Sequence, residues 1–153
     1  MGFAKPSLKG RALRLLAGRE HSRQELERKL ASHEEEPGTL KQALDELQAK
    51  DFINEQRVVD SVLHRRAGRL GAGRIRQELQ AKGLDAEKVA AAVAGLRATE
   101  FERAREVWRR RFGELPADAA QRAKQGRFLA ARGFGGEVIR KVLNSPDDDE
   151  RPN

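Results

Sequence analysis

The feature that most constrains the fold is an internal repeat of about 49 residues. Three apolar stripes share the i, i+3, i+4, i+7 spacing of one helix face. They are Leu40, Ala43, Leu44 and Leu47; Val89, Ala92, Val93 and Leu96; and the start of a third stripe, Ile139, Val142 and Leu143. Other apolar positions keep the same register, since Leu26 corresponds to Ile75 after 49 residues. This agreement predicts a short structural unit that occurs three times in the chain.

Each repeat is predicted to contain three short helices. The expected ranges are 8–17, 22–32 and 38–49; 54–69, 72–82 and 85–98; 100–113, 117–131 and 135–144. Ser22 and Glu25 have the spacing of a capping box, and Gly83 and Gly133 suit the left-handed residue after a helix end. Short amphipathic helices of this kind bury their stripes against one another and against the next repeat. The sequence therefore predicts an all-α fold of three tandem tri-helical repeats in an elongated, modular body.

The repeat divides the chain into unit 1 (1–50), unit 2 (51–99) and unit 3 (100–144). We expect the acidic tail at 145–153 to be disordered and solubilising, because carboxylates and prolines dominate it. Trp108 lies on an apolar helical stripe and is predicted to be a core residue. The same prediction holds for phenylalanines at or near repeat positions, which are Phe52, Phe101, Phe112, Phe128 and Phe134.

The charge pattern indicates an anionic partner. The chain has 31 lysines and arginines against 24 acidic residues, and the formal net charge is +7. Such a basic helical protein suits nucleic acid or a nucleoprotein. Cysteine is absent, which excludes disulfides and thiolate zinc sites, and no apolar run approaches the roughly 18 residues of a spanning helix. Because a signal-peptide pattern is also lacking, we expect a cytoplasmic protein, monomeric and without a membrane or small-molecule partner.

The predicted binding site consists of nine basic side chains in unit 2 and at its borders. Arg65 and Arg69 are four residues apart on one face of the expected helix 54–69. Interleaved acidic residues favour a solvated or paired state for any single arginine, so the prediction rests on the cluster. Guanidinium groups suit phosphates and carboxylates alike, which leaves both targets open. The predicted residues are Arg65, Arg66, Arg69, Arg74, Arg76, Lys82, Arg109, Arg110 and Arg111.

Motifs in units 1 and 2 resemble those of the RecX family. In unit 2 they are Ile53-Asn54-Glu55-Gln56-Arg57-Val58-Val59, Arg65-Arg66 and Gly71-Ala72-Gly73-Arg74-Ile75-Arg76-Gln77-Glu78-Leu79-Gln80-Ala81-Lys82-Gly83-Leu84. In unit 1 they are Ala12-Leu13-Arg14-Leu15-Leu16, His21-Ser22-Arg23-Gln24-Glu25-Leu26 and Lys29-Leu30. The resemblance covers about residues 8–144, and the fold of that family implies three tri-helical repeats.

The resemblance implies a regulator of the RecA recombinase, most often an inhibitor, in DNA repair, homologous recombination and the SOS response. It implies binding in the groove of the RecA–DNA filament, with effects on its ATPase, strand-exchange and co-protease activities. A chain of repeats suits such a filament, because weak contacts to successive protomers multiply through effective concentration. The expected partners are therefore the RecA filament and DNA, reached directly or through the filament.

An enzyme is not expected. His21, His33 and His64 lack the spacing of metal ligands, and Gly71-Ala72-Gly73 lacks the Lys-Ser/Thr of a phosphate-binding loop. No catalytic residue, metal or cofactor is therefore predicted. One alternative stays open, namely an autonomous DNA-binding helical protein that competes for DNA. Spread basic residues and few placed Asn or Gln side chains favour the filament over this alternative.

Overall fold

The structure is a computed structural model that describes residues 5–144. Within this range the chain forms α-helices and one short 3-10 helix, with no strand. The elements are α1 (Leu8–Gly18), α2 (Arg23–Leu30), η1 (Ala31–His33), α3 (Thr39–Ala49), α4 (Glu55–Arg66), α5 (Ala72–Ala81), α6 (Ala86–Arg97), α7 (Glu100–Arg111), α8 (Ala119–Ala131) and α9 (Gly136–Asn144). The predicted acidic tail at 145–153 lies outside the described residues.

Local signals place the helices where the sequence predicts them, and the all-α architecture of three tandem three-helix units is confirmed. The Ser22 side chain accepts from the Glu25 N–H while the Glu25 carboxylate accepts from the Ser22 N–H, which is the predicted capping box. Several boundaries differ by one or two residues, and the largest difference is at α4, which ends at Arg66 and not at residue 69. The Leu70 N–H still donates to the Arg66 carbonyl, but the Gly71 N–H donates to unit 3.

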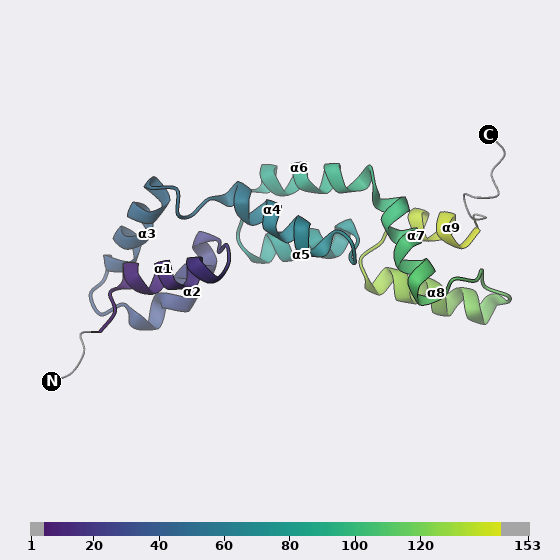
Figure 1. Ribbon diagram of the computed structural model, residues 1–153, viewed down its shortest axis with the longest axis horizontal. Coiled ribbons are helices and arrows are strands. Elements are labelled where there is room, and N and C mark those ends of the chain that lie inside the picture. The colour runs from purple at the N-terminus through teal and green to yellow at the C-terminus, as the bar shows by residue number, and fades with distance from the viewer. Residues whose placement is uncertain (1–4, 145–153) are drawn as a thin grey trace.

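Each unit has its own hydrophobic core. The three cores contain Leu26, Leu30, Leu40, Leu44 and Leu47; Val58, Val62, Ile75, Leu79, Val89 and Val93; and Ala104, Trp108, Leu129, Phe134 and Leu143, among others. Figure 1 shows the consequence, since the three-helix units follow one another in a row and make an elongated body.

The aromatic residues behave as predicted with one exception. Trp108 is a core residue, 4% exposed, and its indole N–H donates to Gln125 Oε1 over 2.8 Å. The prediction for Phe52 is wrong, because this side chain is 47% exposed. After α3 the backbone passes through Asp51 at φ 66°, and Ile53, 4% exposed, takes the buried position. Phe134 is buried, and the other three phenylalanines are partly buried against the core of unit 3.

Both boundaries between units have a hydrogen bond between equivalent positions of the repeat. At junction 1–2, the Ser22 hydroxyl at the start of α2 donates to the Lys82 carbonyl after α5 over 2.6 Å. At junction 2–3, the Gly71 N–H at the start of α5 donates to the Arg132 carbonyl after α8 over 2.8 Å. Gly71 is 49 positions after Ser22, and Arg132 is 50 positions after Lys82. The repeat therefore extends to the way in which successive units dock.

Ion pairs add to the contact at junction 1–2. Glu25 accepts from Lys82 Nζ over 3.1 Å and from Arg19 over 2.7 Å, and Arg57 binds Glu20 over 2.9 Å. Burial raises the pKa of Glu25, but hydrogen bonds from Arg19, the Ser22 N–H and Lys82 outweigh it and lower the pKa to about 2. Ionised Glu25 thus joins the capping box to the next unit.

Acid should weaken junction 1–2 through this carboxylate. Because folding lowers the pKa of Glu25 from 4.5 to about 2, its contribution to stability is complete above pH 4.5 and is lost as the pH falls toward 2. We expect E25Q to be less stable than the wild type near pH 7 and to lose less stability in that window. Thermal unfolding across the pH range checks this, with E27Q at an exposed pair as the control. Parallel pH profiles for wild type and E25Q would contradict it.

Candidate functional site

Two of the predicted basic segments meet at junction 2–3. Arg69 follows the end of α4, and Arg110 and Arg111 lie in the last turn of α7. All three line one open pocket of about 280 Å³, together with Arg132 from the end of α8. We call Arg69, Arg110, Arg111 and Arg132 the junction cluster. The fold therefore gathers four cations from three separate segments around one hollow.

Aromatic rings hold two of these guanidinium groups. Arg111 lies over the rings of Phe112 and Phe128, at 5.9 and 5.5 Å from their centroids, and Arg132 lies over Phe128 at 5.0 Å. The two rings meet edge to face, with centroids 5.4 Å apart. Cation–π contact orients a guanidinium through its face and leaves its N–H groups for an anion. The cluster is thus a supported set of donors.

Acidic side chains neutralise only part of the cluster. Glu106 accepts from Arg110 over 3.0 Å and lies 3.8 Å from Arg109, so one carboxylate serves two cations. Arg110 remains 72% exposed despite this pair. In the part of the chain that the structure describes, neither Arg69 nor Arg132 forms an ion pair with a carboxylate. A positive surface results, suited to the phosphates of a nucleic acid or to carboxylates of a protein.

Three other predicted residues lie near this surface without joining the pocket. Arg65 is exposed on α4, and its side chain donates to the Ser61 carbonyl over 3.4 Å. Arg66 pairs with Glu78 of the same unit over 3.1 Å. Arg74 donates to the Ala131 carbonyl of unit 3 over 2.7 Å, so it serves the docking of the two units. Of these, Arg65 has the most freedom to bind a partner.

Lys82 belongs to the predicted binding site, but the structure does not leave it exposed. Its side chain is only 14% exposed and binds Glu25 across junction 1–2. Arg132 is the equivalent residue of unit 3, and the sequence prediction missed it. The repeat itself carried the signal, since Gly83 and Gly133 are already equivalent and each follows one of these two residues. Arg76 is exposed on α5 and belongs to a different surface, an apolar groove of unit 2.

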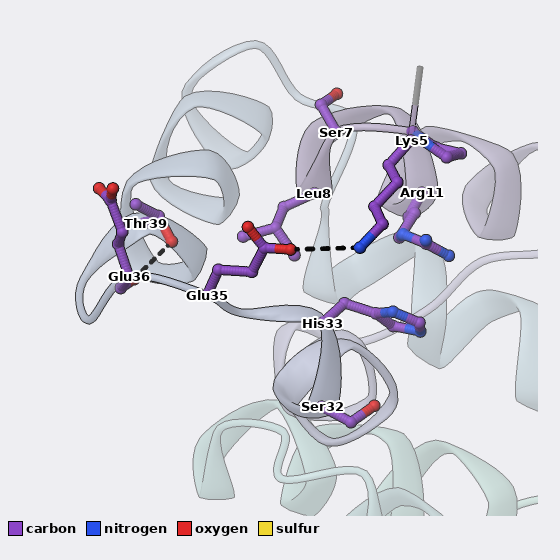
Figure 2. A pocket seen from close by; sticks show the side chains of 10 residues that line it. Lys5, Ser7, Leu8, Arg11, Ser32, His33, Glu35, Glu36 and Thr39 are labelled. Atoms are coloured by element: carbon purple, nitrogen blue, oxygen red, sulfur yellow. Dashed lines mark hydrogen bonds and ion pairs between the residues drawn. The ribbon is translucent and has the colours of Figure 1, made fainter. Parts of the chain in front are cut away.

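Another pocket, at the outer end of unit 1, shows no catalytic arrangement. Figure 2 shows Lys5 reaching toward Glu35, at 3.7 Å, above His33 and beside Arg11. The side chains of Lys5 and Glu35 are 85% and 81% exposed. An ion pair that is this exposed contributes little to stability. Among residues 5–144 no group of three or more His, Cys, Asp or Glu side chains is placed to hold a metal ion. No helix in that range has the length and apolar character needed to cross a membrane.

The fold and the cluster together define a class, that of tandem three-helix-repeat proteins with a basic face at a unit boundary. Family models match all three units: the first three-helix domain of RecX at residues 9–47, the second at 54–93 and the third at 98–143. The regulatory protein RecX of Leptothrix cholodnii is 57% identical over 92% of this chain and 90% of its own length. That of Ralstonia nicotianae is 46% identical over 92% and 89%. The chain belongs to the RecX family.

Solved structures agree with the fold. A crystal structure of a regulatory protein RecX gives a TM-score of 0.75 at 19% identity, over 90% of this chain and 72% of the other. RecX from Lactobacillus salivarius gives 0.74 at 20% identity, over 89% and 92%. At these identities the likeness concerns the fold alone, and it shows that the arrangement of three units is shared by proteins whose sequences have diverged widely.

Proposed function

We propose that this protein regulates RecA, as an inhibitor, by lying in the groove of the RecA–DNA filament and modulating its ATPase, strand-exchange and co-protease activities. The observation that carries the proposal is the junction cluster on an elongated array of docked units. An array spanning several protomers gains avidity from contacts that are individually weak. The protein acts here as a non-catalytic binding partner, as a monomer.

The exposed face of α6 favours the filament over free DNA as the target. In a helix-turn-helix protein, exposed polar side chains of one helix read base edges. One exposed face of α6 carries Ala86, Ala90 and Ala94, which offer no donor to a base or a phosphate, and the exposed Arg97 lies in the last turn of the helix. An autonomous DNA-binding protein remains the second candidate, because the junction cluster suits bare phosphates too.

Titration against the ATPase separates the two candidates. DNA-dependent ATP hydrolysis by the cognate RecA is measured on single-stranded DNA while this protein is added at well below one molecule per RecA monomer. Inhibition at such ratios, with DNA in excess, is the expected result and identifies the filament as the target. Inhibition only when the protein suffices to coat the DNA would favour the DNA-binding alternative.

Charge reversal in the junction cluster should impair this activity. We expect R69E/R110E to need about tenfold more protein for half-inhibition, because two cations of the binding surface become anions. If the cluster binds phosphates, the salt dependence of DNA binding should also fall by about one counterion for each residue changed. R14E/R28E is the matched control, since it makes the same change of charge at exposed positions of unit 1. Equal inhibition by both variants would remove the junction cluster from the site.

A further inference from the structure

Unit 2 carries an apolar groove that the junction cluster does not use. The groove has a volume of about 600 Å³ and lies between α5 and α6. Leu84, Val89 and Val93 belong to the buried core and form its floor. Figure 1 shows α6 along the outer edge of unit 2, with α4 and α5 on its other side. An apolar hollow on an outer edge is open to a partner.

The small residues of α6 keep this groove open. Ala86, Ala90 and Ala94 recur every four residues, so they line one exposed face of the helix. Alanine leaves the backbone accessible and provides no group that a phosphate or a base could bind. This face of α6 therefore suits the apolar side chains of another protein.

The other two units do not carry the same surface. The equivalents of Ala90 and Ala94 are Lys41 and Asp45 in unit 1, where they bind each other over 2.8 Å. Arg23 also binds Asp45, over 2.7 Å, so a polar network occupies the position of the groove. In unit 3 the equivalents are Arg140 and Asn144, both exposed. The same backbone thus accepts polar residues here, and only unit 2 replaces both of them with alanine.

Two cations belong to the lining of the groove. Arg76 lies on α5 and Arg97 in the last turn of α6, and both line the groove and are exposed. Neither guanidinium has an acidic partner within the described part of the chain. The free charges are complementary to carboxylates on whatever occupies the groove.

We infer that this groove binds an amphipathic helix of a RecA subunit, with an apolar face against Ala90 and Ala94 and acidic residues beside Arg76 and Arg97. The identity of the partner rests on the proposed function. The 12 residues of α6 extend about 18 Å, which fits a partner helix of about three turns. Helix-in-groove binding of this type uses apolar anchors at helical spacing. In this scheme the groove of unit 2 binds a RecA subunit of the filament, and the junction cluster binds an anion.

The repeat supplies the variant that tests the inference. A90K/A94D places the residues of unit 1 at the equivalent positions of unit 2, where they can pair with each other and fill the groove. A91K/G95D is the matched control, because it introduces the same pair at exposed positions next to the groove. Labelled protein is titrated with cognate RecA filaments on single-stranded DNA, and separately with that DNA alone.

We expect A90K/A94D to bind filaments about tenfold or more weakly than the wild type, with unchanged affinity for bare DNA. R76E/R97E should lose a similar factor, which tests the groove independently of its packing, and A91K/G95D should bind as the wild type does. Full filament binding by A90K/A94D and R76E/R97E would overturn the inference. So would a wild-type dimer in sedimentation that A90K/A94D abolishes, since a second copy would then be the occupant. Wild-type protein that binds filaments no better than bare DNA would instead overturn the proposed function.

Discussion

Replacing Gly71 with alanine is expected to lower the free energy of unfolding by about 2–4 kcal/mol. A Cβ atom at this position would lie 2.4 Å from the backbone carbonyl of Gly133, closer than any real contact of that kind. The backbone of Gly71, at φ −81° and ψ 169°, is one that alanine adopts without strain. The whole cost therefore comes from the collision between units 2 and 3, which breaks the hydrogen bond from Gly71 to Arg132.

Urea unfolding of G71A measures this cost, and hydrogen exchange locates it. The Gly73 N–H donates to the Gly133 carbonyl over 3.1 Å, so its exchange should become faster in the variant while core amides of unit 1 keep their protection. G95A is the control, because a Cβ there meets nothing and a helical glycine gains about 0.5–1 kcal/mol on becoming alanine. A stable G71A with slow Gly73 exchange would show that the units are not held together by this contact.

The fold could be predicted from the sequence because each helix carries its own local signals. The apolar stripes at Leu44 and Val93 and the capping box at Ser22 act within a few residues, and the structure contains them as predicted. Phe52 shows where such reasoning fails. Its apolar character and its alignment with Phe101 indicated a core position, but a turn through left-handed Asp51 decides which neighbour faces inward. Burial at a turn depends on backbone geometry that the repeat does not specify.

Much less of the candidate site could be predicted. Arg69 and Arg110 are predicted because basic residues cluster in their segments, yet nothing in the sequence indicates that they line the same pocket. Lys82 and Arg132 occupy equivalent positions after their helices. Lys82 forms an ion pair with Glu25, whereas no carboxylate in the described range pairs with Arg132. Whether a cation is paired depends on the surface of the preceding unit. Contacts between units thus decide which arginines remain available to a partner.

The second large effect on stability is expected at Arg103, a residue that the sequence analysis does not single out. Arg103 lies in α7 of unit 3, and its guanidinium group extends to unit 2. There it donates to the carbonyls of Ala67 and Leu70, each over 2.7 Å, and to that of Leu96 over 3.1 Å. Burial lowers the pKa of Arg103, and Glu100 counteracts this. One planar group thus binds backbone carbonyls that follow α4 and one in the last turn of α6.

We expect R103A to lower the free energy of unfolding by about 2–4 kcal/mol, because three carbonyls lose a charged donor at once. R103K should recover less than half of this loss, since a single ammonium cannot reproduce the fork that spans two helix ends. R127A, at an exposed position of unit 3, should stay within about 0.5 kcal/mol of the wild type in the same urea titration. If R103K were as stable as the wild type, the positive charge of Arg103 would account for its contribution to stability. The planar geometry of the guanidinium would then have no part in fixing the angle at which the basic face is presented.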